Sequence, residues 1–376
     1  MVTRDAIAVI GAGLAGAACA RAFSRAGCDV TVFDQAGDCA SGASGNPVGI
    51  LHPLHSRDRN LATLWTELGC ATTLRWIDEL TPLARERGWG RLADRCGVLQ
   101  MDARAQHLVA WWPWAAWVRP AQLVRACLAD AVLAGARMAL GRRVQTVSAG
   151  GVLQFSDGTS AAFDAVVVCN ATDMDRLMPR HGLMLNAIRG TITSFAIDAA
   201  RSLPCVICAQ GYATPVIDGQ MVVGASFERI DDGQDRGMPP GEDRHAHSGD
   251  ADEGGDISNL ERLRIISEPL WEAASCAVAS SRTSLRSAAL DRMPHVGRVV
   301  DPDVTLLPRM SRLEHMPRSQ RLWVLGAMGS RGLAHAALGA EVLAALMLGR
   351  MPPVPARLLA AVDPVRFVLR RHQRGK

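Results

Sequence analysis

The N-terminal part of the chain combines short apolar runs with small, flexible residues. The run from Ala6 to Ile10 is apolar throughout, which is typical of a strand buried on both faces. The glycine-rich segment 11–16 follows directly and leads into an alanine-rich helical pattern that reaches about Arg25. Gly27 ends that helix, and the run 29–33 predicts a second strand. The pattern therefore predicts a strand–turn–helix–strand unit.

Later apolar runs predict more of the same sheet. Residues 142–147 and 165–171 are expected to be two further strands of it. Residues 322–325 lead into the glycine-rich loop 326–332 and then into a helix. This is a second strand–loop–helix unit, and its loop can present backbone N–H groups to a ligand.

The middle of the chain has a different pattern. Val206, residues 212–216 and residues 221–227 are expected to be strands, with a turn at Asp218-Gly219. Residues 231–256 are acidic, rich in glycine and without apolar periodicity, so they predict a disordered surface insertion.

The first glycine segment has the spacing of a dinucleotide-binding turn. Gly11 allows the tight turn, Gly13 allows the backbone to approach a pyrophosphate, and Gly16 allows the helix to pack on the strand. The N-terminus of the helix, with Leu14 and Ala15, would face the phosphates with unpaired N–H groups and the positive end of its dipole.

The residues after the second strand favour FAD over NAD. Asp34 ends that strand, where a carboxylate accepts hydrogen bonds from the adenosine ribose. The segment 41–53 is rich in small and hydroxyl residues, which suits a chain that follows an extended FAD. Further expected cofactor contacts are Gly42, Ala43, Ser44, Asn46, Gly49, Val144, Asn170, Gly326, Gly329, Ser330, Arg331 and Gly332. Non-covalent attachment is expected because residues 282–332 contain no cysteine.

Composition excludes several kinds of chemistry. The chain has 41 lysines and arginines, and the only lysine is Lys376, so no internal lysine can form a Schiff base. Among the ten cysteines, Cys205 and Cys208 are the only close pair, which is half of a tetrahedral zinc site at most. No metal is therefore expected. The 48% hydrophobic and 21% charged residues are typical of a globular protein, and the length favours two domains.

No run of residues is long and apolar enough to predict a membrane-spanning helix. The most apolar helical stretch, after Gly332, is interrupted by His335 and Glu341. A cytoplasmic location is expected.

Several longer motifs carry a family resemblance. They are GASGNPVGILHP (42–53), WVRPAQLVRACL (117–128), LNAIRGTITSF (185–195), VVGASF (222–227), RTSLRSAALDRMPHVG (282–297) and GSRGL (329–333). The chain resembles the D-amino-acid-oxidase-type FAD oxidoreductases. More narrowly, it is similar to the C-terminal oxidoreductase domain of the bifunctional tRNA 5-methylaminomethyl-2-thiouridine biosynthesis proteins.

The resemblance implies an α/β fold with a discontinuous domain organisation. A Rossmann-like FAD domain would take residues 1–53, 117–184 and 282–376. A mainly antiparallel substrate domain would take residues 54–116 and 185–281.

The resemblance also implies a reaction. The substrate would be a tRNA wobble uridine bearing a 5-carboxymethylaminomethyl group, with or without 2-thio substitution, and its products 5-aminomethyluridine and glyoxylate. Arg286 would anchor the substrate carboxylate, with Arg331 and Arg189 as further candidates. Tyr212 is either a pocket wall or a packed aromatic. Molecular oxygen is the expected electron acceptor, and a separate methyltransferase is expected to act on the product because this chain begins at the FAD strand.

Two other functions share these features. One is a small-molecule oxidase acting on glycine, sarcosine or a D-amino acid, which needs no tRNA. The other is a non-catalytic, FAD-containing RNA-binding protein. The basic residues between Arg366 and Lys376 favour tRNA if they contact phosphate, although a solvated end has the same composition.

Overall fold

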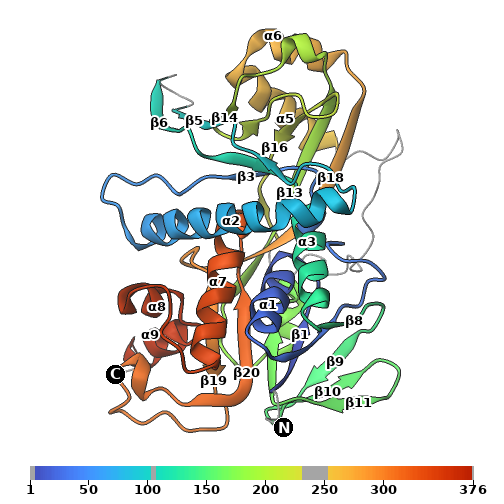
Figure 1. Cartoon of the computed structure of the whole chain (residues 1–376). Coiled ribbons are helices and arrows are strands. Elements are labelled where there is room, and N and C mark those ends of the chain that lie inside the picture. The colour runs from blue at the N-terminus through green and yellow to red at the C-terminus, as the bar shows by residue number, and fades with distance from the viewer. Residues whose placement is uncertain (1–4, 103–106, 231–252, 375–376) are drawn as a thin grey trace.

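The computed structural model describes residues 5–102, 107–230 and 253–374. Two halves lie one above the other, and the N-terminal strand and the C-terminal helix both belong to the lower half (Figure 1). The expected α/β fold, with a Rossmann-like part and a second, mainly antiparallel sheet, is confirmed.

A six-stranded sheet forms the centre of the lower half. Its order is β19 (His295–Val300), β20 (Arg318–Gly326), β12 (Ala165–Val168), β1 (Ala6–Ile10), β2 (Asp29–Phe33) and β8 (Arg137–Ala139). Neighbouring strands are parallel except β19 and β20. Ile7 and Val9 enter one apolar core, whereas Ala8 and Ile10 enter another. Because both faces of β1 are buried, its sequence is apolar without alternation.

Different layers cover the two faces of this sheet. The helices α1 (Leu14–Arg25), α3 (Pro120–Leu133) and α7 (Gly332–Met347) share the core of Ile7 and Val9. The opposite face is covered by α4 (Met174–Leu177) and by a three-stranded antiparallel sheet. Its strands are β9 (Val144–Val147), β10 (Val152–Phe155) and β11 (Ser160–Ala162).

The placement of β9 corrects one expectation. Residues 142–147 were expected in the main sheet, but β9 belongs to the small sheet and β8 takes the edge of the main one. The burial pattern gives the reason: Val144 is buried, while Gln145 and Thr146 are exposed. A strand with one apolar face suits a sheet that has solvent on its other side.

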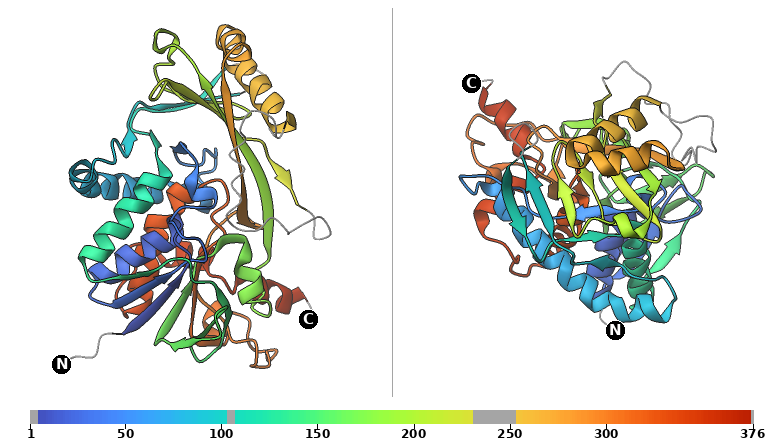
Figure 2. Two further views of the ribbon diagram at one scale, coloured as in Figure 1. Left: turned by 90° about the vertical axis from the view of Figure 1, so that its right-hand side faces the viewer. Right: turned by 90° about the horizontal axis from the view of Figure 1, so that it is seen from above.

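The second half is built on an eight-stranded sheet. Its path is β17 (Glu228–Arg229), β13 (Leu185–Ala196), β16 (Gln220–Gly224), β15 (Tyr212–Ala213), β14 (Val206–Cys208), β5 (Val98–Met101) and β6 (Leu108–Trp112). β18 (Ala279–Ala289) pairs with β13 along its length, and these two long strands extend from the upper half toward the lower one (Figure 2). The strands expected around Val206, Tyr212 and Met221 are confirmed, as is the turn at Asp218-Gly219.

Helices cover one face of that sheet. α5 (Glu253–Ile266) and α6 (Glu268–Ser275) pack on Phe195, Met221 and Val223. Asn259 is fully buried and donates to the Thr191 carbonyl (3.1 Å) and to Thr193 Oγ1 (2.9 Å), which fixes α5 on β13.

The start of α5 also bears on the expected insertion. Residues 231–252 lie outside the described residues, but residues 253–256 form the first turn of α5. Asp256 Oδ1 accepts hydrogen bonds from Thr193 Oγ1 (2.6 Å) and from Ser281 Oγ. The expectation of disorder is therefore wrong for residues 253–256, which begin α5, and the side chain of Asp256 hydrogen-bonds to β13 and β18.

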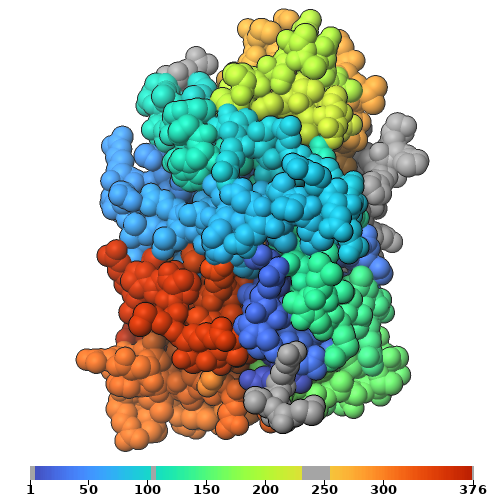
Figure 3. Space-filling view, in the orientation of Figure 1, coloured from blue at the N-terminus to red at the C-terminus, as the bar shows by residue number. Residues whose placement is uncertain are grey.

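The long helix α2 (Leu61–Glu86) packs against the lower half. Its Trp65 and Trp76 belong to the same core as α1 and α7. A Cβ at Gly69 would overlap the carbonyl oxygen of Ala334, so the two helices approach backbone to backbone. In the space-filling view α2 is a light-blue band between the two halves (Figure 3). Residues 54–116 were expected in the substrate domain. α2 belongs to this range, but it buries its apolar face against α1 and α7 of the lower half.

The remaining elements complete the chain. A small sheet contains β3 (Gly49–Leu51), β7 (Ala116–Val118) and β4 (Ala93–Asp94), and α8 (Ala356–Val362) and α9 (Arg366–Arg374) close the lower half. Within the described ranges, no helix has the length and apolar character needed to cross a membrane.

Candidate active site

A cavity of about 1790 Å³ lies between the two halves. Its wall comes from the β1–α1 turn, from the segment 41–52 and from the loop 326–332, and on the other side from β13, β15 and β18. Both glycine-rich loops expected to bind one cofactor therefore face a single space.

The first glycine loop has the geometry that its sequence predicts. Gly11 has a φ of +109°, and a Cβ there would lie 2.8 Å from the carbonyl oxygen of Cys169. A Cβ at Gly16 would overlap the carbonyl oxygen of Gly11, so the turn and the helix can meet only through glycine. Gly13 lies on the cavity wall at the N-terminus of α1. At Gly11 and Gly13 the loop therefore presents backbone to the cavity at the end of β1.

Two side chains organise the backbone around this loop. Asp34 Oδ2 accepts from the Ala12 N–H (2.6 Å) and its Oδ1 accepts from the Ala36 N–H (2.9 Å). Ser44 Oγ accepts from the Leu14 N–H (2.9 Å). Asp34 and Ser44 also line the cavity, so each holds the wall in place and still presents oxygen atoms to it.

Buried polar atoms without hydrogen-bond partners gather around the cavity. In the described part of the chain, such atoms on lining residues are Asn46 Oδ1, His52 Nδ1, Arg142 Nε, Asn170 Oδ1, Ser284 Oγ and Ser287 Oγ. A buried polar atom without a hydrogen bond is costly, and proteins keep few of them. Their concentration here fits a large polar ligand that would supply the missing partners.

The second glycine loop lies against β18. The Gly329 N–H donates to the Ser287 carbonyl oxygen (2.7 Å), and Ala288 pairs with Met328 across a β-bridge. A Cβ at Gly326 would overlap the side chain of Met174. The expected residues Gly326, Gly329, Ser330, Arg331 and Gly332 all line the cavity.

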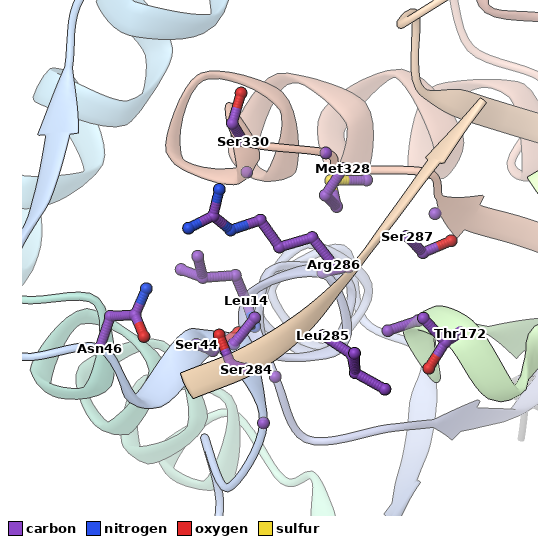
Figure 4. Close-up of a pocket in the computed structure, with 18 of the residues that line it drawn as sticks. Leu14, Ser44, Asn46, Thr172, Ser284, Leu285, Arg286, Ser287, Met328 and Ser330 are labelled. Carbon is purple, nitrogen blue, oxygen red and sulfur yellow. The ribbon is translucent and has the colours of Figure 1, made fainter. Parts of the chain in front are cut away.

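Arg286 extends from β18 into the cavity, toward the space between Leu14 and Ser330 (Figure 4). Among the residues that the structure describes, no carboxylate lies within 4.0 Å of its guanidinium nitrogens, so no salt bridge neutralises it there. Burial lowers the pKa of Arg286, and the nearby Tyr212 opposes this shift. Arginine nevertheless stays charged in proteins. The site thus holds a cation that lacks a protein counter-ion within the described ranges.

Arg331, from the second glycine loop, is a further cation of the cavity wall. Burial lowers its pKa, and the neighbouring thiols Cys70 and Cys208 act in the opposite direction. Burial also lowers the pKa of His52 to about 4, and Arg331 lowers it further by charge repulsion. His52 is therefore a neutral ring beside a cation at neutral pH.

Tyr212 and Arg189 have different positions. Tyr212 lines the cavity, and burial raises the pKa of its hydroxyl to about 12, opposed by Arg286. Arg189 does not reach the lining: it forms a partly exposed ion pair with Glu228 (3.5 Å). The structure therefore brings Arg286, Arg331 and Tyr212 together and leaves Arg189 outside.

The basic C-terminal segment is partly structural. The Arg366 side chain is 3% exposed and forms an ion pair with Asp291 (2.7 Å), which Arg370 also contacts (3.2 Å). Arg366 also donates to the Met293 carbonyl (2.9 Å). Arg366 is thus neutralised inside the fold and does not belong to a free basic tail, whereas Arg370 stays half exposed. Lys376 lies outside the described residues.

The expected site omitted several lining residues. His52, Gln100, Cys208, Phe227, Ser284 and Ser287 also line the cavity. His52 and Phe227 stand in the motifs GASGNPVGILHP and VVGASF, so their neighbourhood was singled out without the residues themselves. Gln100 and Cys208 reach the wall from neighbouring strands of the upper sheet, a pairing that no local pattern indicates.

Comparisons with known proteins agree with this cavity. The family model described as FAD dependent oxidoreductase matches residues 6–346. The tRNA 5-methylaminomethyl-2-thiouridine biosynthesis bifunctional protein MnmC of Burkholderia ambifaria is 32% identical, over 98% of this chain and 60% of its own length. Its counterpart in Burkholderia thailandensis is also 32% identical, over 100% of this chain and 61% of its own length. The chain thus spans about three fifths of these relatives.

Solved structures share the fold at low sequence identity. Glycine oxidase from Geobacillus kaustophilus has a TM-score of 0.71 at 19% identity, covering 96% of this chain and 99% of its own. Iminodiacetate oxidase from Chelativorans sp. BNC1 has a TM-score of 0.68 at 20% identity, covering 95% and 98%. With the family match over most of the chain, and a cavity whose glycine loops and unpartnered polar atoms fit a dinucleotide, the cofactor is FAD and the chain belongs to the FAD dependent oxidoreductase family.

Proposed function

We propose that this enzyme oxidises a C–N bond of 5-carboxymethylaminomethyluridine, or its 2-thio form, at the wobble position of tRNA. The products are 5-aminomethyluridine and glyoxylate. The observation that carries the proposal is Arg286, a cation that projects into the cavity without a carboxylate partner among the described residues. The names and the 32% identity of the MnmC relatives support a tRNA substrate.

The first glycine loop would hold the pyrophosphate of FAD at the N-terminus of α1, and Asp34 would accept from the ribose. Ser44, Asn46 and Asn170 line the same space and would complete this end. The loop 326–332 would lie at the flavin end, next to Arg286. Bound FAD supplies the two-electron acceptor for the oxidation.

The protein must position the substrate and keep its amine reactive. Arg286 would anchor the glycine-like carboxylate through its two-pronged guanidinium, and Arg331 would bind a second oxygen of the substrate or cofactor. Both cations disfavour a protonated amine in this cavity, and a neutral amine is the form that is oxidised. Loss of a hydride from the glycine-like methylene and of a proton from nitrogen gives an imine. Water then splits the imine into the primary amine and glyoxylate.

This function has consequences for partners. We propose molecular oxygen as the final electron acceptor and a methyltransferase as the enzyme that acts on the 5-aminomethyl product. We also propose a cytoplasmic location, where the tRNA substrate would be met.

The test uses bulk tRNA from cells that lack this oxidation step. The purified enzyme is incubated with that tRNA, and the nucleosides are then separated and identified. The expected result is loss of 5-carboxymethylaminomethyluridine, gain of 5-aminomethyluridine and one glyoxylate for each nucleoside converted. An Arg286→Ala variant that has kept its FAD is the matched control.

The same experiment separates the other functions. Oxidation of glycine, sarcosine or a D-amino acid with no change in tRNA nucleosides would establish a small-molecule oxidase instead. Binding of tRNA without turnover of any amine would indicate a non-catalytic RNA-binding flavoprotein.

A further inference from the structure

Phe227 is an exposed aromatic side chain on the cavity wall. It is 57% exposed and lies just after β16. A soluble protein gains stability by burying such a ring, so a ring kept at the edge of a binding cavity is a feature of recognition sites. The other aromatic rings that line the cavity, Phe33 and Tyr212, are buried or half-buried.

The backbone around Phe227 is fixed on both sides. Ser226 donates its N–H to the Thr191 carbonyl (3.0 Å), and its Oγ accepts from the Thr191 N–H (2.8 Å). Directly after Phe227, β17 pairs with β13, with Glu228 opposite Arg189. The backbone that carries the ring is therefore held by strand pairing, and little backbone freedom is lost when a ligand covers the ring.

Phe227 also lies close to the proposed carboxylate anchor. A Cβ at Gly190 would come within 2.7 Å of the Arg286 guanidinium carbon and within 3.0 Å of the Ser226 carbonyl oxygen. Both groups thus surround the same point above β13. Phe227 follows Ser226 in the chain, so its backbone lies beside the guanidinium, and both residues line the cavity.

We infer that Phe227 stacks on the uracil ring of the reacting nucleotide; this inference rests on the proposed function. In that substrate only two methylenes and a nitrogen separate the carboxylate from the base. A carboxylate held by Arg286 leaves the base at the cavity rim, within reach of Phe227. Every nucleobase has a π-face that an aromatic side chain can cover.

The test compares three substrates. N-methylglycine has the carboxylate and the amine but no base, the free nucleoside 5-carboxymethylaminomethyluridine adds the base, and tRNA adds the remaining nucleotides. Steady-state turnover is followed by the release of glyoxylate, with oxygen as the electron acceptor, for the wild type and for Phe227→Ala, Phe227→Leu and Phe227→Trp. Leu133→Ala, an exposed apolar residue of α3 outside the cavity lining, is the control.

Phe227→Ala is expected to raise KM about tenfold for the nucleoside and for tRNA, with kcat nearly unchanged. N-methylglycine should be unaffected. Phe227→Trp should restore the KM, whereas Phe227→Leu should not, because leucine is apolar but has no π-face.

Three results would overturn the inference. An equal rise in KM for N-methylglycine would mean general damage to the pocket. A rise in KM for tRNA alone would place the Phe227 contact on a neighbouring base instead of the reacting uracil. Full rescue of the KM by Phe227→Leu would show that apolar contact is sufficient and would rule out stacking. Failure of the proposed function looks different: the wild type would then convert neither the nucleoside nor tRNA, and the stacking role would fall with it.

Discussion

At the scale of single residues, Arg286 combines burial with the lack of a protein counter-ion in the described part of the chain. Desolvation of a cation is costly, and the buried Arg21 is paired with Asp130 (2.9 Å). Arg286 is held by β18, opposite Ile188, so its position does not depend on a loop. This geometry supports the proposal that the substrate carboxylate is the counter-ion of Arg286.

Arg286→Ala is expected to keep its fold and its FAD and to lose most of its activity. Loss of a charge-assisted pair in a desolvated site costs on the order of 2–4 kcal/mol of transition-state binding. Arg286→Lys should recover only part, because an ammonium group cannot form the two-pronged pair. kcat/KM for any carboxylated amine measures this, with the exposed Arg201→Ala as control. Near-wild-type turnover would make Arg331 the anchor instead.

Gly190→Ala tests the position of the Arg286 side chain while Arg286 itself is not substituted. The added Cβ would lie 2.5 Å from Nη2 of Arg286, and the end of that flexible side chain can move away. We expect normal FAD content, a melting temperature close to that of the wild type and a clear rise in KM for carboxylated amines. An unchanged KM would show that binding of carboxylated amines does not depend on the position of the guanidinium over Gly190.

At the scale of elements, α9 is attached to the fold through Arg366. This residue pairs with Asp291 and stands beside the buried His295, and Arg366 Nη1 and His295 Nδ1 are 2.9 Å apart. Arg366→Ala would leave Asp291 without its buried partner and should cost about 3–5 kcal/mol of unfolding free energy. The exposed Arg374→Ala should leave stability unchanged. Denaturant unfolding of the two variants decides between a structural segment and a solvated tail.

The contact between α2 and α7 predicts a pH dependence. His335 Nδ1 accepts from Trp65 Nε1 (3.1 Å), and burial, then Arg331, lower the pKa of His335 to about 3. Above pH 6.5 the His335 imidazole is neutral in both the folded and unfolded states, so its titration does not reduce the free energy of unfolding. Below it, the unfolded chain takes up a proton that the folded chain does not. Stability therefore falls by about 1.4 kcal/mol per pH unit for this group.

His335→Gln keeps an acceptor for Trp65 and removes the titration. Between about pH 7 and pH 5 the unfolding free energy of the wild type should fall by roughly 2 kcal/mol more than that of this variant. Identical pH profiles would show that His335 titrates normally in the folded protein.

At the scale of the whole molecule, the cofactor cavity joins segments from both ends of the chain. FAD bound there should raise the melting temperature, because it binds the folded state only. Gly13→Val would place a side chain on the wall where the pyrophosphate is proposed to lie, 3.0 Å from Ser44 Oγ at its Cβ. We expect the Gly13→Val variant to be colourless, because it would not bind FAD. Acid precipitation of the wild type should release its FAD, and flavin that stays with the precipitate would contradict non-covalent attachment.

The sequence alone determined the parts of the molecule whose geometry is local. The order of strand, glycines and helix around Gly11 follows from backbone sterics within a few residues, and the structure has the elements that this order predicts. The turn at Asp218-Gly219 is local for the same reason, since both residues have positive φ. The family motifs further predicted FAD as the cofactor and singled out the stretch around Arg286 as part of the site.

Only the tertiary structure decided what depends on partners distant in the chain. β9 lies outside the main sheet and α2 packs against α7, because burial of a face depends on which other element covers it. Arg189 and Arg286 stand in equally polar stretches, yet pairing of β13 with β18 and β17 sends one to an ion pair with Glu228 and the other into the cavity. Charge alone could not separate them, because the role of an arginine is set by its neighbours in space.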